Sequence, residues 1–268
     1  MARNKQQRLL KELRQLDSLL VAFSGGADSA YLAWAAHVAL GERALAVTAL
    51  SPSFSAYDRE QAEGFVRHVG LRHEFIETHE LENPLYIANS PDRCYHCKAE
   101  LFTEIEKRMA SLGFARVAYG INADDTHDFR PGHRAAAEHK VLAPLLDVAL
   151  TKEEVRELSR AAGLPTWNRP ASACLASRIP YGTPVTPQSL SLVEQGEAIL
   201  RELGFRQFRV RLHQELARIE IAPLELPRAL NPQMAAVLAR RFKQLGFTYV
   251  TLDLEGYRQG SLNSVLQK

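Results

Sequence analysis

The chain has 268 residues, 46% of them hydrophobic, and its 33 basic and 31 acidic side chains give a formal net charge of +2. This length allows one large domain or two modest ones, and the near-neutral charge argues against a protein held on nucleic acid by bulk positive charge. The N-terminal residues lack the apolar core of a signal peptide, and no segment has the roughly 18 uninterrupted apolar residues of a membrane span. We therefore expect a cytoplasmic protein without a membrane partner.

Apolar runs alternate with helical patterns over most of the first 165 residues. The runs expected to be strands are Leu19–Phe23, Ala44–Leu50, His73–Ile76 and Val117–Tyr119. The segments with helical spacing are Arg8–Leu16, Ser29–Leu40, Ser55–Val69 and Lys98–Leu112. Thr151 followed by Glu154 forms a capping box that opens another helix, to about Ala162. This alternation predicts an α/β fold with a parallel sheet covered by helices on both faces.

The segment Ser24-Gly25-Gly26-Ala27-Asp28-Ser29 joins the first strand to the next helix. Two adjacent glycines let consecutive backbone amides point at one anion, and the helix N-terminus stands behind the same anion. Ser24 and Ser29 add hydroxyl donors, and Asp28 has the carboxylate that a magnesium ion between phosphates needs. No lysine stands where a Walker loop requires one. The six residues resemble the SGGxDS signature of the PP-loop ATP pyrophosphatases, which implies cleavage of ATP between its α and β phosphates and adenylation of a substrate.

Ligands of such sheets bind beyond the carboxyl ends of the strands. The residues that we expect there, in an ATP and phosphate site, are Ser24, Gly25, Gly26, Asp28, Ser29, Ser51 and Gly120. Asp124 and Asp125 follow the Val117–Tyr119 strand. They either complete a magnesium site with Asp28 or are the paired acids of an ordinary turn.

A proline-rich segment separates two different patterns. We divide the chain into a PP-loop domain over 1–168, a linker over 169–187 and a C-terminal domain over 188–268. The elements expected in the last domain are a helix over Gln188–Leu203, strands over Gln207–Leu212 and Ala217–Ile221, a helix over Pro232–Leu245 and a strand over Thr248–Leu252. This order predicts a small α+β domain with a mainly antiparallel sheet.

The chain has three cysteines, too few for a disulfide framework. The spacing of Cys94 and Cys97 suits two ligands of one metal or cluster, a redox disulfide, or a reduced pair with no ligand. Cys174 lies in the linker near Arg178, whose positive charge favours the thiolate form. An inert small hydrophobic residue is the alternative for Cys174.

Several separated motifs occur in one order along the chain: Ser24–Ser29, Arg93–Lys98, Gly120–Asp125, Arg130-Pro131-Gly132, Cys174–Arg178, and Gly256-Tyr257-Arg258 with Ser261-Leu262-Asn263. Over nearly its whole length the chain resembles the LarE sulfur transferases, PP-loop enzymes that help to build the nickel-pincer nucleotide cofactor. The resemblance implies ATP-dependent conversion of the carboxylates of pyridinium-3,5-biscarboxylic acid mononucleotide to thiocarboxylates. It also implies a sulfur donor and a homo-oligomer.

The family uses cysteine sulfur in two ways. Some members sacrifice the sulfur of one cysteine, and here the Cys174 thiolate would attack the acyl-adenylate. Other members hold a [4Fe–4S] cluster on three cysteines, and Cys94, Cys97 and Cys174 fit this second type. On that interpretation Cys174 is a cluster ligand rather than a nucleophile.

A substrate with one phosphate and two carboxylates needs cations. Our candidates are Arg178, Arg209 and Arg211, because guanidinium groups bind both anions with two-pronged hydrogen bonds. Arg209 and Arg211 flank Val210, so on a strand both side chains face the same side. Glu220 either orients one of these cations or pairs with a strand neighbour. The alternative for each arginine is a solvated surface position.

Other functions share parts of this pattern. A tRNA-thiolating enzyme shares the loop and the cysteines, although the small net charge argues against nucleic acid. An amide-forming synthetase shares the loop but needs a glutaminase. A non-catalytic nucleotide or redox sensor is the alternative outside enzymes.

Overall fold

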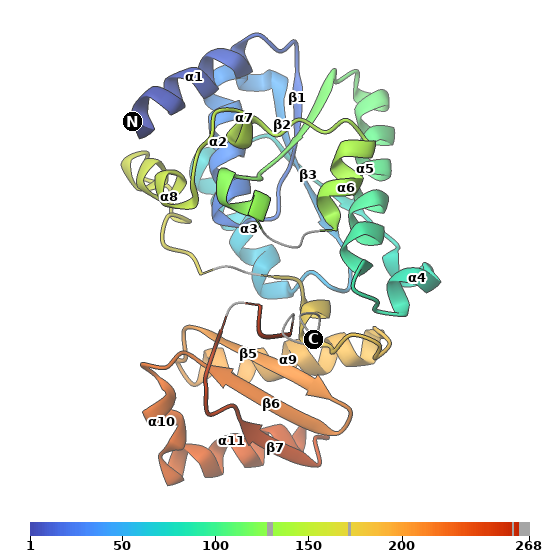
Figure 1. The fold of residues 1–268 in the computed structure, drawn as a ribbon, viewed down its shortest axis with the longest axis vertical. Coiled ribbons are helices and arrows are strands. Elements are labelled where there is room, and N and C mark those ends of the chain that lie inside the picture. The colour runs from blue at the N-terminus through green and yellow to red at the C-terminus, as the bar shows by residue number, and fades with distance from the viewer. Residues whose placement is uncertain (128–130, 171–172, 259, 263–268) are drawn as a thin grey trace. The chain divides into compact units, whose positions relative to one another are not determined.

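The computed structural model describes residues 1–127, 131–170, 173–258 and 260–262, and Figure 1 traces the chain. Contacts divide it into two compact units, one of Met1–Glu80 with Asp92–Ser172 and one of Leu81–Pro91 with Ala173–Lys268. The sequence motifs include Arg130 and Asn263, which lie outside the described residues. None of the described helices is both long and apolar enough to cross a membrane.

The strands are β1 (Leu19–Ala22), β2 (Ala44–Leu50), β3 (His73–Glu77), β4 (Arg116–Tyr119), β5 (Phe208–His213), β6 (Leu216–Ile221) and β7 (Tyr249–Leu252). The α-helices are α1 (Ala2–Arg14), α2 (Ala27–Leu40), α3 (Ala56–Val69), α4 (Pro84–Ile87), α5 (Arg93–Leu112), α6 (Gly132–Glu138), α7 (Pro144–Asp147), α8 (Lys152–Ala161), α9 (Pro187–Glu202), α10 (Leu226–Leu230) and α11 (Pro232–Gln244). The short 3-10 helices are η1 (Gly41–Arg43), η2 (Glu80–Glu82), η3 (Ala123–His127) and η4 (Leu175–Arg178).

The first unit contains a four-stranded sheet in the order β3-β2-β1-β4. Every strand pair in it is parallel, since β1 pairs with β2 and β4, and β2 pairs with β3. The crossovers between these strands run through α2, α3 and α5, as the alternating sequence pattern predicts. The parallel α/β architecture is therefore confirmed, and β1, which is inside the sheet, ends where the glycine loop begins.

Helices cover both faces of this sheet, as predicted (Figure 1). All four residues of β1 are buried, but they face two different cores. Leu19 and Val21 pack in one core with residues of α1, α2, α3 and α8. Leu20 and Ala22 pack in the other with residues of α5 and α6. A strand buried on both faces reads as a continuous apolar run, which explains the sequence Leu-Leu-Val-Ala.

The second unit contains a three-stranded sheet in the order β5-β6-β7. The β5 and β6 strands form an antiparallel pair, but β6 and β7 are parallel. The expectation of a mainly antiparallel sheet is therefore wrong for one of the two pairings, because α10 and α11 carry the chain back to the start of β6 before β7 begins. In α9, Gly196 leaves space for Phe242 and Val210, which a Cβ atom at this position would approach to 3.1 and 3.2 Å.

Candidate functional site

The predicted phosphate loop lies between β1 and α2, as expected from the sequence. The helix begins at Ala27, two residues earlier than predicted, so Asp28 and Ser29 belong to its first turn. Gly25 has φ of +73°, in the left-handed region that favours glycine. Gly26 is the N-cap and has no side chain to cap the helix, and the start of a helix is a favourable place for an anion.

Hydrogen bonds within the loop fix its shape. The Ser29 hydroxyl donates to the carbonyl oxygen of Gly26 at 3.1 Å and accepts from the amide of Ser24 at 3.2 Å. The hydroxyl oxygens of Ser24 and Ser29 are 3.1 Å apart. Ser29 is buried whereas Ser24 is exposed, so Ser29 braces the loop and Ser24 faces outward.

Gly120 follows β4 and packs against the first turn of α2. A Cβ atom at Gly120 would lie 2.6 Å from the amide nitrogen of Ser29 and 2.9 Å from the carbonyl carbon of Asp28. Glycine is therefore required here by the close approach of two backbones. This contact gives Gly120 a packing role beside the predicted phosphate site.

A buried hydrogen-bond chain supports the loop from the β2 and β3 side. Thr48 donates its hydroxyl hydrogen to the carbonyl oxygen of Phe23 at 2.7 Å, directly before the loop. His73 Nε2 lies 2.9 Å from the same hydroxyl oxygen, so Nε2–H is the donor. Burial lowers the pKa of His73, although the charges of Glu63 and Glu74 act in the opposite direction.

One loop contact comes from a residue that the sequence did not single out. Arg169 donates to the carbonyl oxygen of Gly25 at 2.9 Å and to Asp58 Oδ1 at 2.8 Å. Gly25 and Arg169 are 144 positions apart. No local spacing pattern marks such a contact, and Arg169 fell within the predicted linker.

The other residues predicted at the strand ends are held by partners within the first unit. Ser51 Oγ is 2.8 Å from Ser53 Oγ, after β2. Asp124 Oδ2 accepts the amide hydrogen of Lys152 at 2.8 Å, and the Lys152 ammonium lies 2.8 Å from Asp125 Oδ1. Among the described residues, no three His, Cys, Asp or Glu side chains form a group that could hold a metal ion. The magnesium role of Asp28, Asp124 and Asp125 therefore stays a prediction.

Cys94 and Cys97 lie at the start of α5. The helix begins at Arg93, five residues earlier than predicted, so both cysteines are helical and three positions apart on one face. Cys94 is exposed and Cys97 is half-buried. The Arg134 guanidinium stacks on the Tyr95 ring at 3.9 Å and ties this turn to α6.

Cys174 belongs to the second unit, where it is exposed and caps η4. Its carbonyl oxygen accepts from the Ser177 hydroxyl at 2.7 Å and from Arg178 Nη1 at 3.0 Å. Arg178 therefore shapes the turn that carries the cysteine. Cys94 and Cys97 lie in the first unit, so the three predicted sulfur ligands are divided between the two units.

The predicted substrate arginines gather on one network in the second unit. Arg178 forms a two-pronged pair with Glu197 of α9, at 2.8 and 3.2 Å, and the two residues are 2% and 4% exposed. Burial alone raises the pKa of Glu197, but the charge and hydrogen bonds of Arg178, with the charge of Arg209, outweigh it and hold the pKa below its usual value. The sequence did not single out Glu197. Its only signal was an acidic residue on the buried face of an amphipathic helix.

Arg211 and Glu220 pair across the antiparallel strands β5 and β6. Arg211 Nη2 donates to Glu220 Oε2 and to the Ser261 hydroxyl, both at 2.8 Å. Arg211 Nη1 donates to the carbonyl oxygen of Ser177 at 2.9 Å, which joins this pair to η4. Arg218 also contacts Glu220, at 3.3 Å. Glu220 therefore pairs with cations on both strands.

Arg209 lies on the same strand face as Arg211, and its guanidinium stands 5.0 Å from the Tyr257 ring centroid. Burial, and then the neighbouring charge of Arg178, lowers the pKa of Arg209. The solvated-surface alternative is wrong for Arg178 and Arg211, which are only 2% and 5% exposed.

Two nitrogen donors of this network lack a hydrogen-bond acceptor among the described residues. Within the described part of the chain, the Nε atoms of Arg211 and Arg218 are buried without a hydrogen-bond partner. Unsatisfied buried donors are costly unless a ligand or water completes them. Four arginines (178, 209, 211 and 218) share this network with three carboxylates (Glu197, Glu220 and Asp253), so the excess positive charge suits an anion.

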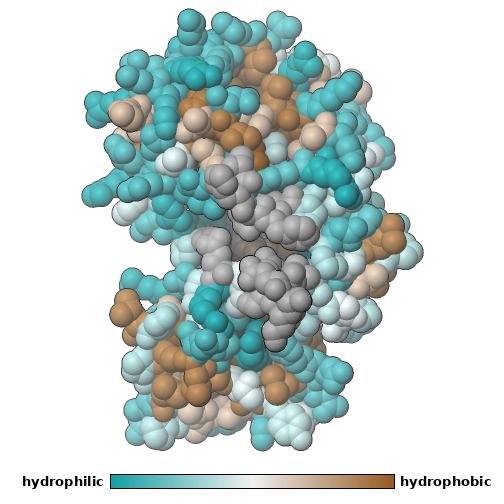
Figure 2. Space-filling view, in the orientation of Figure 1, coloured by the Kyte–Doolittle hydropathy of each residue, from teal (hydrophilic) through white to brown (hydrophobic). Residues whose placement is uncertain are grey.

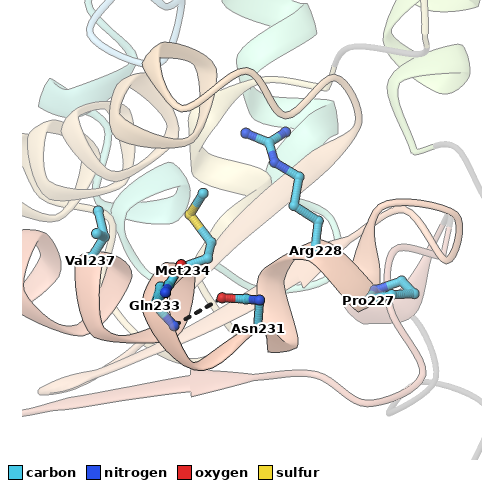
Figure 3. Close-up of a pocket in the computed structure, with 6 residues that line it drawn as sticks. All are labelled: Pro227, Arg228, Asn231, Gln233, Met234 and Val237. Carbon is cyan, nitrogen blue, oxygen red and sulfur yellow. Dashed lines mark hydrogen bonds between the residues drawn. The ribbon is translucent and has the colours of Figure 1, made fainter.

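An open depression elsewhere on the second unit holds none of the predicted site residues. Pro227, Arg228, Asn231, Gln233, Met234 and Val237 line it, at the junction of α10 and α11 (Figure 3). Asn231 accepts the amide hydrogen of Gln233 at 3.0 Å, as an ordinary helix cap. Apolar side chains such as Leu224 and Leu254 are exposed on the same unit, and Figure 2 shows brown areas there. The candidate functional residues are therefore, in the first unit, the loop with Cys94 and Cys97 and, in the second unit, Cys174 with the arginine network.

No family model matches the chain. A search of known proteins finds relatives that are similar over all or nearly all of it. It is 42% identical, over the full length of both chains, to an uncharacterized protein of Synechocystis sp.. It is 34% identical to the pyridinium-3,5-bisthiocarboxylic acid mononucleotide synthase of Lactiplantibacillus plantarum, over 98% of this chain and 95% of the relative. More distantly, it is 27% identical to one component of the glutamine-hydrolyzing GMP synthase of Thermococcus kodakarensis, over 72% of this chain and 68% of the relative.

The parallel sheet, the glycine loop after β1 and the distant similarity to GMP synthase are compatible with a PP-loop fold. The similarity to the mononucleotide synthase extends over nearly all of both sequences. The chain belongs to the family of the LarE-type pyridinium-3,5-bisthiocarboxylic acid mononucleotide synthases.

Proposed function

We propose that this protein is an ATP-dependent sulfur transferase that adenylates a carboxylate of pyridinium-3,5-biscarboxylic acid mononucleotide and converts it to a thiocarboxylate. The product would serve the biosynthesis of the nickel-pincer nucleotide cofactor. The observation that carries the proposal is the braced loop Ser24–Ser29 in a chain that is similar over nearly its full length to a named synthase.

ATP activation is the first step in this proposal. A carboxylate is a poor electrophile because its leaving group would be oxide, and adenylation replaces oxide with AMP. The N–H groups at the start of α2 would bind a phosphate and stabilise the charge that develops on it. Asp28 would hold Mg²⁺ together with ATP phosphates, since Mg²⁺ commonly uses one or two carboxylates and completes its shell with phosphate and water.

Substrate recognition is assigned to the arginine network. The unsatisfied Nε donors of Arg211 and Arg218 suit the phosphate or a carboxylate of the mononucleotide. Glu220 keeps Arg211 in place by a direct hydrogen bond, and Glu197 does the same for Arg178. Buried carboxylates that hold arginines in this way orient cations without cancelling the whole positive charge of the network.

Sulfur supply is assigned to the three thiols. Cys94 and Cys97 have the donor type and helical spacing of two cluster ligands, and Cys174 is the remaining cysteine. A [4Fe–4S] cluster on three cysteines would supply an iron with an open coordination position at which sulfur is held. In the alternative, Cys174 would give up its own sulfur in a single turnover.

The activation step is tested by release of pyrophosphate and AMP. Anaerobically purified protein receives ATP, Mg²⁺ and the pyridinium substrate, and both products should appear only when all three are present. Asp28→Ala should abolish the reaction, whereas Asp17→Ala, which changes an aspartate outside the loop, should not. Wild-type protein that releases no pyrophosphate would overturn the proposal.

The sulfur source is tested on the same preparation. Bound iron and sulfide, a visible absorption band and repeated turnover with added sulfide are the expected results. A colourless, iron-free protein that loses the mass of one H₂S per turnover would exclude the cluster and establish the sacrificial route.

A further inference from the structure

Arg169 ties the phosphate loop to α3 with two hydrogen bonds. One guanidinium nitrogen donates to the carbonyl oxygen of Gly25 at 2.9 Å, and the other donates to Asp58 Oδ1 at 2.8 Å. The Arg169 and Asp58 side chains are 12% and 16% exposed, so the ion pair is largely shielded from solvent. All three residues belong to the first unit.

The hydrogen bond to the Gly25 carbonyl also fixes the orientation of the peptide group between Gly25 and Gly26. The carbonyl of Gly25 and the N–H of Gly26 belong to one planar trans peptide, so they point in opposite directions. A donor that holds the carbonyl therefore sets the direction of the Gly26 N–H. In the structure that N–H donates to the Ser24 hydroxyl oxygen within the loop, at the long distance of 3.5 Å.

Arg169 is itself held at its backbone. Arg156 of α8 donates to the carbonyl oxygen of Arg169 at 2.8 Å and to that of Trp167 at 3.1 Å. The acceptor Asp58 is also anchored, because its Oδ2 accepts from Ser55, the N-cap of α3, at 2.7 Å. The guanidinium thus connects the Gly25 carbonyl to two groups that have hydrogen bonds of their own, the Arg169 backbone and the Asp58 carboxylate.

We propose that Arg169 is a positioning residue for the phosphate of bound nucleotide, because it aims the Gly26 N–H into the anion site of the loop. The inference rests on the proposed function in one respect, that the loop binds ATP. It assigns Arg169 no contact with ATP. It predicts that loss of the guanidinium weakens nucleotide binding more than it weakens folding.

The test compares ATP affinity and steady-state kinetics of the full-length protein in three variants. Arg169→Met removes both hydrogen bonds, and Arg169→Lys keeps one positive donor. Arg43→Met is the matched control, since Arg43 also donates to two backbone carbonyls, those of Leu16 and Asp17, away from the loop.

Arg169→Met should bind ATP about ten- to a hundredfold more weakly, the loss expected when the Gly26 N–H no longer points at the phosphate and its hydrogen bond to that charged group is lost. The KM for ATP should rise by a similar factor, and Arg169→Lys should recover part of the loss. Arg43→Met should bind ATP like the wild type. A merely structural role would instead lower kcat and the unfolding temperature and leave the KM for ATP unchanged.

The two proposals fail in different ways. ATP affinity of Arg169→Met within twofold of wild type, or a loss of kcat at constant KM, would overturn the positioning role alone. Wild-type protein that binds ATP without thiolating the mononucleotide would overturn the proposed function, and the affinity comparison would still decide the role of Arg169. Wild-type protein that binds no ATP would overturn both.

Discussion

Replacement of Gly120 by alanine probes how closely β4 must approach the phosphate loop. The added Cβ atom would lie 2.6 Å from the Ser29 nitrogen and 2.7 Å from the Ser29 Cα, both of them backbone atoms. Ordinary van der Waals contact begins near 3.4 Å, so the strand end or the first turn of α2 must move by up to about 0.8 Å.

Two effects of different size follow from this displacement. Overpacking of this kind destabilises a fold by about 1–3 kcal/mol. A displacement approaching 1 Å at a reacting group costs roughly a hundredfold in rate, because the reacting atoms leave their productive geometry. We therefore expect Gly120→Ala to remain folded but to release pyrophosphate about two orders of magnitude more slowly.

Urea unfolding followed by circular dichroism measures the first effect, and pyrophosphate release measures the second. Gly64→Ala is the matched control, because Gly64 lies within α3 and a Cβ atom there would meet nothing within 4 Å. Alanine in a helix interior should stabilise this control by up to ~1 kcal/mol. A Gly120→Ala protein as stable and as active as the wild type would refute the reasoning.

Two further predictions concern buried charged groups. Glu197→Gln leaves Arg178 buried without its ion partner and should lower the free energy of unfolding, measured in urea, by about 3–5 kcal/mol. The control Glu63→Gln, which changes a more exposed ion pair, should lower it by less than ~1 kcal/mol. Equal losses in the two variants would contradict the importance of burial. Because burial lowers the pKa of His73 from its ordinary 6.5, the unfolded chain binds more protons just below that pH and stability falls as the pH falls. His73→Gln should therefore flatten the drop in unfolding temperature below pH 6.5, and a slope parallel to that of the wild type would contradict this assignment.

Local signals in the sequence predicted the first unit well. The apolar run of β1 reflects burial on both faces of a parallel sheet, and the glycine loop that follows it was recognisable from residue types alone. The capping box of Thr151 and Glu154 is present at the start of α8, with both of its hydrogen bonds. Each of these features depends on residues only a few positions apart.

Contacts between distant residues were not predictable in the same way. Arg169 reaches Gly25 across 144 positions, and Glu197 pairs with Arg178 from the next helix. The parallel pairing of β6 and β7 likewise depends on how α10 and α11 return the chain, which no alternation pattern records. The arginines at 178, 209 and 211 were chosen for their chemistry, but their buried pairing with acids needed the structure.

The grouping of residues 81–91 with the C-terminal unit affects how the protein is made. Asn89 is fully buried, and its side-chain amide donates to the carbonyl oxygens of Ile179, Pro180 and Thr183, which are 90 to 94 positions later. Chains that emerge from the ribosome usually fold the N-terminal domain first. Here the segment around Asn89 must wait until about ninety more residues have been synthesised. During translation Asn89 therefore gains these three acceptors only after residues 179–183 have been added to the chain.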